Sequence, residues 1–380
     1  MRTGTGMGMR TGTGTGMAEV TPVTLLTGFL GAGKTTLLNH LLRHPALART
    51  AVLVNEFGEI GLDHLLMEKV DPDTVLLNAG CLCCTVRGDL VRVLRKLLPR
   101  ARRDEIARVV IETTGLADPA PILATLTADP AVASAYRLDG VVTVVDALFG
   151  DSQLDAQFEA VRQVAVADRI VLSKTDLADP APLRARIARL NPGAPVIEAA
   201  FGAVDPAAVL AAGPFDPKSK IPDVAGWLHA EAVAAAEHDA GHDHEGHGHE
   251  GHGHEGHGHK AHGHGGTGHD HDRNRHGADV QAFCITLEEP LPWQGIGTWL
   301  EMLVATRGDA LLRIKGILNL EGQPKPVAIH GVQHVMHPPT LLPDWPEGDP
   351  RTSRLVFITR DLPRAAIEDG LRAFAQAARR

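Results

Sequence analysis

The stretch GFLGAGKTT at residues 28–36 constrains this chain more than any other, because its residue types suit one purpose in one structural setting. An apolar segment at Val23–Thr27 precedes it and the helix-like LLNHLLRH follows, which is the order of a phosphate-binding loop. Glycines let backbone N–H groups wrap phosphate oxygens, Lys34 reaches the β and γ oxygens, and the Thr35 hydroxyl binds Mg²⁺. This context disfavours a chance glycine-rich turn. The residues expected at the phosphates are Gly28, Gly31, Ala32, Gly33, Lys34, Thr35 and Thr36.

A second motif, Glu112-Thr-Thr-Gly115, closes the apolar run RVVIE. GTPases with a phosphate-binding loop carry an acid-x-x-Gly element here, which approaches Mg²⁺ and the γ-phosphate. We therefore expect Lys34, Thr35 and Glu112 to be catalytic and Gly115 to contact the nucleotide. Leu116 stands where many GTPases place a water-orienting Gln, so hydrolysis should be slow unless a metal, a partner or another residue helps.

A third motif, Ser173-Lys174-x-Asp176, ends another apolar run and takes the position of the guanine-reading Asn-Lys-x-Asp. A carboxylate at Asp176 can accept hydrogen bonds from N1–H and N2–H of guanine, an edge that adenine does not present. Ser173 replaces the usual Asn and can make fewer hydrogen bonds. The motif still favours GTP, with Ser173, Lys174 and Asp176 as the base-binding residues.

Apolar strands alternate with helix-like segments over the first half of the chain, which predicts a mostly parallel sheet covered on both faces. The expected strands are residues 23–27, 50–56, 74–80, 108–115, 140–147 and 169–176, with a helix at 89–98. After residue 280 the pattern predicts a smaller α+β domain. Its expected strands are 280–287, 311–320, 327–337 and 354–359, with helices at 293–307 and 364–378.

The remaining segments have compositions that cannot form a core. Residues 1–17 repeat MRTGTG and are expected to be a disordered or spurious extension ahead of a chain that starts at Met17. Residues 238–276 hold fourteen of the 21 histidines among glycines and acids, which is typical of a disordered tether. The predicted organisation is an α/β P-loop GTPase domain at 18–215, a linker with this His-rich segment at 216–277, and a C-terminal domain at 278–380.

Composition excludes several classes of function. A net charge of −9 and a pI near 6.1 give no sign of a nucleic-acid-binding surface. No apolar run approaches the roughly 18 to 20 residues that span a bilayer, and the N-terminus lacks the apolar core of a secretory signal. Four cysteines without such a signal favour a reducing cytoplasm, where clustered thiols bind metal or react more often than they form disulfides.

Three of these cysteines, Cys81, Cys83 and Cys84, lie within four positions of the stretch NAGCLCCTVRG. Thiolates suit Zn²⁺ and related metals, commonly with tetrahedral coordination. Cys81 and Cys83 would share a face on a strand, and Cys81 and Cys84 on a helical turn. A further ligand would come from Glu56, His64, water or a client, and such an incomplete site suits a carrier. A redox pair and buried small residues are the alternatives.

The histidines and Cys284 are the other candidate metal ligands in the sequence. The His-rich tether presents many imidazoles without fixed geometry, so it should collect or buffer divalent metals unselectively, or act only as a solubilising spacer. His330, His334 and His337 are expected to be structural, and Cys284 is expected to lie in a core.

Together these residues resemble the CobW-type GTPases, a metallochaperone-like family of P-loop GTPases with a CxCC motif. The matching pieces are TGFLGAGKTTLLN, NEFGEIGLD, CLCC, ETTGLADP, SKTD and RIKGIL. The resemblance implies a P-loop G domain, the family's smaller C-terminal domain, and GTP-dependent delivery of zinc or cobalt to metalloenzymes. It also implies that Glu56 and Asp63 belong to switch I, near Mg²⁺ or the metal.

The sequence therefore favours a GTP-hydrolysing metallochaperone with GTP, Mg²⁺ and Zn²⁺ (or Co²⁺) as its ligands. We expect Cys81, Cys83, Cys84 and Glu56 to bind the transported metal and Thr35 to bind Mg²⁺. A client metalloprotein is the expected partner, and binding to nucleic acid or to a membrane is not expected. The sequence leaves open whether the protein forms a homodimer. The alternatives are a nickel-insertion accessory GTPase and a His-rich metal buffer with vestigial GTPase activity.

Overall fold

The computed structural model describes residues 20–55, 76–79, 82–210, 280–345 and 348–380. At residues 55, 76–79, 82–87 and 89 it describes the backbone alone. Predictions about the N-terminal repeat, the His-rich tether, Glu56 and Cys81 lie outside the described residues.

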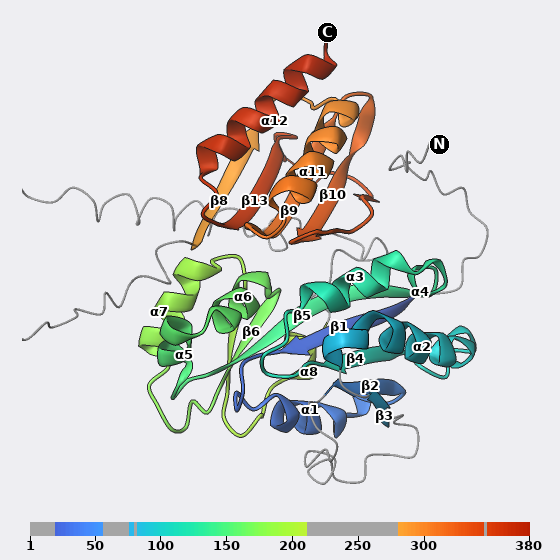
Figure 1. The fold of residues 1–380 in the computed structure, drawn as a ribbon, viewed down its shortest axis with the longest axis vertical. Helices are drawn as coiled ribbons and strands as arrows, with labels where there is room; N and C mark the ends of the chain where they lie inside the picture. Colours follow the sequence, from blue (N-terminus) through green and yellow to red (C-terminus); the bar gives the residue numbers. More distant parts are fainter. Residues whose placement is uncertain (1–19, 56–75, 80–81, 211–279, 346–347) are drawn as a thin grey trace, which may run out of the picture.

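The first domain is built on seven parallel strands in the order β3-β2-β4-β1-β5-β6-β7 (Figure 1). The strands are β1 (Thr21–Thr27), β2 (Thr50–Asn55), β3 (Leu76–Ala79), β4 (Arg108–Glu112), β5 (Tyr136–Asp146), β6 (Arg169–Ser173) and β7 (Val196–Ala199). All residues of β5 except Arg137 are buried, because helices cover both faces of the sheet. Since every pair is parallel, the carboxyl ends of the strands meet at one edge, where open α/β sheets bind ligands.

The helices of this domain divide between the two faces of the sheet. They are α1 (Lys34–Leu42), the 3₁₀ turn η1 (Pro45–Leu47), α2 (Leu82–Arg102), α3 (Ala120–Ala128), α4 (Pro130–Ala133), α5 (Gly150–Ala156), α6 (Phe158–Val166), α7 (Ala181–Leu190) and α8 (Pro206–Val209). Leu37 and Leu38 of α1 pack with Val209 of α8 on one face. Leu94 of α2 and Ile187 of α7 belong to the two apolar clusters on the other face.

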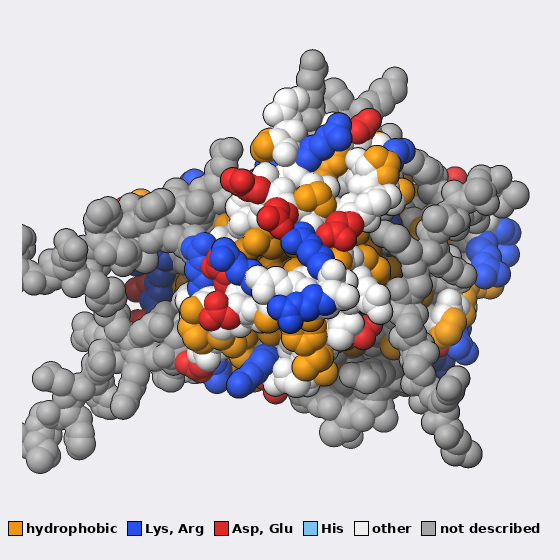
Figure 2. All heavy atoms as spheres, turned by 90° about the horizontal axis from the view of Figure 1, so that it is seen from above, with side chains coloured by type: hydrophobic (Ala, Val, Ile, Leu, Met, Phe, Trp, Pro, Cys, Tyr) orange, Lys and Arg blue, Asp and Glu red, His pale blue; other side chains and the backbone are white. Residues whose placement is uncertain are grey.

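The C-terminal domain is an antiparallel sheet with two helices on one face. It comprises β8 (Val280–Leu287), α11 (Trp293–Arg307), β9 (Leu311–Leu320), β10 (Gln323–Val332), β11 (Val335–Met336), β12 (Thr340–Leu341), β13 (Ser353–Arg360) and α12 (Arg364–Ala378). The strand order is β11-β10-β9-β13-β8, and β12 pairs with β10. Trp299 of α11 meets Phe357 of β13 edge-on, and Phe357 stacks on Phe283. Seen from this end of the molecule, acidic, basic and apolar side chains are interspersed on the surface (Figure 2).

The opposite face of this second sheet packs on α3, α6 and α7 of the first domain (Figure 1). Val332 and Val335 belong to the same apolar cluster as α2–α4, and Leu312 and Ile358 to that of α5–α7. The cores of the two domains are therefore continuous across their interface.

A buried ionic cluster also crosses this interface. Asp168, directly before β6, pairs with Arg313 and lies 3.0 Å from Nζ of Lys315, both on β9. Its other oxygen accepts the N–H of Val141 at 2.9 Å, and Arg313 also donates to the Val166 carbonyl. Burial acts to raise the pKa of Asp168, but the positive charges of Arg313 and Lys315 outweigh it and hold that pKa far below its ordinary value. The carboxylate therefore stays ionised and joins the domains.

The predicted fold class is confirmed; the predicted elements differ from the structure in several bounds, one missed strand and one strand that is divided in two. The strands expected at 108–115 and 169–176 end at Glu112 and Ser173, because the motif residues that follow form loops. Strand β7 was missed, and the helix expected at 89–98 begins at Leu82. The strand expected at 327–337 is two strands, since the chain turns at Gln333 and His334. Among the described residues no helix has the length and apolarity to cross a bilayer.

Candidate nucleotide-binding site

The glycine loop joins the end of β1 to the start of α1 and has the backbone that phosphate binding requires. Gly28, Gly31 and Gly33 have φ angles of 143°, 73° and 91°, which favour glycine over other residues. A Cβ on Gly28 would lie 2.3 Å from the carbonyl oxygen of Val144, so the loop runs directly against β5. Gly33 precedes α1 without any side-chain cap, and the first turn of α1 has no acid. The backbone amides at the start of α1 can therefore face an anion.

Lys34 holds its ammonium group over this loop. Its Nζ donates to the carbonyl oxygens of Gly28 at 2.8 Å and Phe29 at 3.1 Å, and the side chain is largely buried. This is the predicted place for a charge that meets phosphate oxygens.

Thr35 and Glu112 meet across the edge of the sheet, as the motifs predict. The Thr35 hydroxyl donates to Oε1 of Glu112 at 2.7 Å, although the residues are 77 positions apart. Hydroxyl and carboxylate oxygens are the donor types that Mg²⁺ takes, so this pair fits the cation beside the phosphate loop.

Gly115 brings its loop against the phosphate loop. A Cβ at Gly115 would lie 2.5 Å from the backbone nitrogen of Leu30, which only glycine avoids. The Gln163 amide of α6 fixes this segment by donating to the carbonyls of Gly115 at 3.1 Å and Ala117 at 3.3 Å. Leu116 projects an apolar side chain that is 50% exposed. Sequence reasoning missed Gln163, because nothing in its local pattern sets it apart from other helix residues.

The Ser173–Asp176 segment lies on the other side of the phosphate loop. The Ser173 hydroxyl donates to the carbonyl of Ala32 at 2.6 Å, so it supports the phosphate loop. Lys174, with φ 58°, pairs with the buried carboxylate of Asp146. Asp176 is exposed on the turn that follows. Asp146 was not predicted, although an acid at the end of the apolar run GVVTVVD was the available signal.

A further segment closes this side of the site. The turn after β7 packs on the first turn of α1, since a Cβ on Gly202 would lie 3.1 Å from the Thr36 carbonyl. Phe201 in this turn is 80% exposed and has φ 53°. Sequence reasoning missed this turn because it carries no motif.

The cysteine segment enters the structure at the same edge of the sheet. Parallel strand β3 ends at Ala79 and α2 begins at Leu82, so Cys83 and Cys84 occupy the first turn of that helix. Their side chains are not among those described, and Glu56 and Cys81 lie outside the described residues. Within the described part of the chain, no three His, Cys, Asp or Glu residues are grouped to hold a metal. Cys284 is buried in the C-terminal domain, as predicted.

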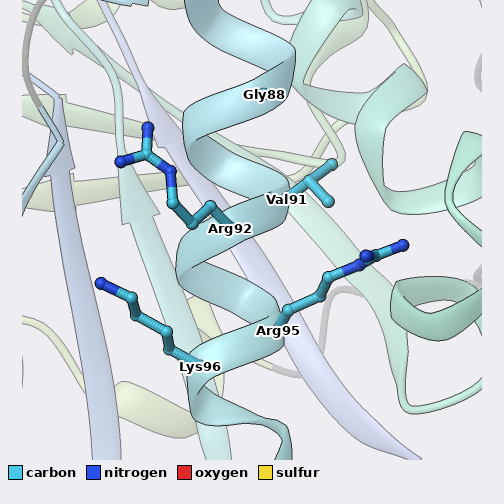
Figure 3. A pocket seen from close by; sticks show the side chains of 5 residues that line it. All are labelled: Gly88, Val91, Arg92, Arg95 and Lys96. Atoms are coloured by element: carbon cyan, nitrogen blue, oxygen red, sulfur yellow. The ribbon is translucent and has the colours of Figure 1, made fainter.

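An open hollow of about 450 Å³ begins one turn further along α2. It is lined by Gly88, Val91, Arg92, Arg95 and Lys96, whose basic side chains spread outward from the helix (Figure 3). Arg95 pairs with Asp129 at 2.7 Å. This hollow is separate from the phosphate loop and holds none of the predicted site residues.

The glycine loop, the Thr35–Glu112 pair and the two flanking motifs define a P-loop nucleotide-binding protein of the GTPase class. Comparison with family models assigns the family. Residues 22–198 match the CobW/HypB/UreG nucleotide-binding domain, and residues 280–375 match the cobalamin synthesis protein cobW C-terminal domain. The chain belongs to the CobW family, as its resemblance predicted.

Curated relatives agree with this assignment. The chain is 33% identical to the zinc chaperone YjiA of Escherichia coli (strain K12), over 91% of this chain and 96% of that protein. It is 32% identical to the zinc chaperone CobW of Pseudomonas aeruginosa, over 92% and 90% of the two chains. The match to zinc-regulated GTPase metalloprotein activator 1 of Schizosaccharomyces pombe is 41% identical and covers 49% and 47%.

The solved structure of Zn(II)-bound YjiA GTPase from E. coli is similar throughout. It superposes with a TM-score of 0.62 at 29% identity, over 94% of this chain and 99% of that one. A Zn(II)-bound YjiA variant with one glutamate and two cysteines replaced by alanine gives the same TM-score.

Proposed function

We propose that this protein hydrolyses GTP and uses the nucleotide cycle to bind zinc and release it to client metalloproteins. The observation that carries the proposal is the convergence at one sheet edge of the phosphate loop, the Thr35–Glu112 pair, the Gly115 loop and the backbone turn bearing Cys83 and Cys84. The names of the relatives, zinc chaperone and zinc-regulated GTPase, support the choice of zinc.

In this proposal the phosphate loop binds the β- and γ-phosphates through its backbone amides and Lys34. Thr35 and Glu112 hold Mg²⁺, which when bound supplies positive charge to the phosphate oxygens. Gly115 contacts the γ-phosphate through its backbone. Leu116 cannot orient a water molecule, so we expect slow intrinsic turnover.

Guanine is read by Asp176 on the exposed turn after β6. Because the Ser173 hydroxyl is engaged with Ala32, it supports the phosphate loop and leaves base recognition to Asp176. The ion pair of Lys174 with Asp146 fixes the backbone that presents Asp176. Asp176→Asn should therefore favour xanthine over guanine.

Zinc is bound by Cys81, Cys83 and Cys84 with Glu56, and cobalt is the alternative metal for the same donors. The γ-phosphate orders the loops at this sheet edge, as in other P-loop proteins, and hydrolysis loosens the metal site near a client. Zn(II) is also present in the YjiA variant that lacks one glutamate and two cysteines. A test of the cysteine site must therefore remove other zinc-binding segments.

The test is to titrate Zn²⁺ and Co²⁺ into protein lacking residues 238–276, with a non-hydrolysable GTP analogue and with GDP. Linkage predicts that metal binds more tightly with the GTP analogue by about 5- to 150-fold. The difference should vanish in Cys83→Ala and Cys84→Ala.

Cys284→Ala is the matched control, because Cys284 is a buried cysteine outside the cluster. It should keep the nucleotide-dependent difference. Equal metal affinity with both nucleotides would contradict the chaperone cycle and favour a metal buffer.

A further inference from the structure

The turn between β10 and β11 in the C-terminal domain has an unusual backbone. Val332 pairs with Val335, so Gln333 and His334 form the whole turn. Gln333 has φ 50°, a conformation that favours glycine, yet its side chain is large and the residue is almost fully buried. Strained positions of this kind persist where the surroundings hold them, and they cluster at functional sites.

His334 anchors this turn to the end of α11. Its Nδ1 lies 3.0 Å from the carbonyl oxygen of Val304, and its Nε2 lies 3.1 Å from Oδ1 of Asp309. A Cβ on Gly308 would lie 2.1 Å from the imidazole ring, so glycine makes room for this contact. The turn is therefore fixed within its own domain.

Gln333 reaches from this fixed turn into the first domain. Its Nε2 lies 3.4 Å from both carboxylate oxygens of Asp118. Asp118 also accepts hydrogen bonds from Nη1 of Arg162 at 2.5 Å and from the backbone N–H of Ala120 at 3.0 Å. One carboxylate thus joins the C-terminal domain, α6 and the start of α3.

Asp118 ends the segment that begins at Gly115. Neighbouring residues of α6 hold both parts of this segment, because Gln163 donates to the carbonyls of Gly115 and Ala117 while Arg162 pairs with Asp118. Gln333 adds the contact from the other domain. Segment 115–118 is consequently braced from two sides.

We propose that Gln333 is a positioning residue of the GTPase site, through which the C-terminal domain holds the loop that contacts the γ-phosphate. The inference rests on the proposed function, because it assigns that contact to Gly115. A braced loop loses less conformational freedom when it binds the γ-phosphate than a loose one. The brace therefore favours GTP and leaves GDP, which lacks the γ-phosphate, unaffected.

The experiment compares GTP-analogue affinity, GDP affinity and kcat in the full chain and in variants at Gln333. Gln333→Gly removes the amide, and glycine suits the positive φ, so we expect the turn to keep its conformation. It should weaken the GTP analogue by about three- to tenfold, as expected for the net loss of one ordinary hydrogen bond, and leave GDP within about twofold. The kcat of GTP hydrolysis should fall together with the affinity for the GTP analogue.

Gln333→Glu sets a carboxylate against Asp118 and should have the larger effect on GTP. Gln281→Ala is the matched control, since the Gln281 amide donates to the carbonyl of Leu362, a contact within the C-terminal domain. It should change neither affinity.

An unchanged ratio of GTP to GDP affinity in Gln333→Gly would overturn the inference, whether both affinities fall together or neither changes. If the unaltered protein fails to bind GTP, the proposed function itself is wrong, which is a different result.

Discussion

The two ends of β6 both carry charged and polar residues, which are partly exposed at one end and buried at the other. At its carboxyl end, Ser173 supports the phosphate loop, and the following turn presents Lys174 and the exposed Asp176. At its amino end, Asp168 is buried against Arg313 and Lys315 of the other domain. The five-residue strand β6 thus connects an exposed polar segment to a buried ionic cluster.

The difference shows how position on one strand divides function from assembly. The carboxyl edge of a parallel sheet is open to ligands, so its polar groups can stay exposed. At the amino end the C-terminal domain covers Asp168, and a buried charge must keep its partners. The interface therefore depends on the ion cluster for integrity more than for net stabilisation.

Two histidines extend the buried cluster on the side of the C-terminal domain. His330 of β10 stacks on His337 with ring centroids 4.8 Å apart; His330 is buried and His337 is half-buried. Burial lowers the pKa of His337 to about 4, and burial, with His337 and Arg313, lowers that of His330 well below its ordinary value. Both imidazoles are therefore neutral in the folded protein at pH 7.

The largest effect is expected at the amino end of β6. Asp168→Ala leaves Arg313 and Lys315 buried without their carboxylate, which should lower the free energy of unfolding by about 3–5 kcal/mol. Chemical denaturation measures it. Glu198→Ala on the neighbouring strand β7 is the control, because its pair with Arg184 is exposed and should contribute less than about 1 kcal/mol. Similar losses in the two variants would show that the buried carboxylate contributes no more to stability than the exposed one.

The next effect is a dependence of stability on pH. His330 and His337 bind protons more weakly in the folded state, so their contribution to stability is present above pH 6.5 and is lost as pH falls towards 4. Each histidine should lower the free energy of unfolding by about 1.4 kcal/mol per pH unit in that window. The facing charges are Asp168, Arg313 and Lys315.

Chemical denaturation between pH 7 and pH 4.5 measures this slope. His337→Phe keeps an aromatic ring against His330 but cannot be protonated, so its slope should be shallower. An equal slope in both proteins would show that other groups control the acid response.

A smaller effect is expected at the carboxyl end of β6, without loss of stability. Asp176→Asn replaces an acceptor by a donor facing the guanine amino group, which should cost about 1–3 kcal/mol of GTP affinity and favour xanthosine triphosphate. Nucleotide titration measures both. Asp179→Asn, three residues along and outside the motif, is the control. If ATP competes as well as GTP in the unaltered protein, the guanine assignment is wrong.

The sequence alone predicted the parallel sheet, the C-terminal α+β domain, the phosphate loop and the meeting of Thr35 with Glu112. The sheet and the loop follow from local patterns, because apolar periodicity reports burial and the motif glycines report backbone geometry. The proximity of Thr35 and Glu112 follows from the motifs, which assign both residues to the same Mg²⁺. The roles of Glu56 and the three clustered cysteines stay predictions. Asp146 could have been predicted from the sequence, because it is an acid at the end of a predicted strand.

Only the tertiary structure decided which distant residues complete the site and join the domains. Three contacts bring together residues between 46 and 215 positions apart in the sequence. They are those of Gln163 with the Gly115 segment, of Asp118 with Gln333, and of Asp168 with Arg313 and Lys315. In the sequence an Asp before a strand, or a Gln in a turn, reads as a solvated polar residue. Its role depends on which surface the second domain covers, and that is set by the packing of whole sheets and helices.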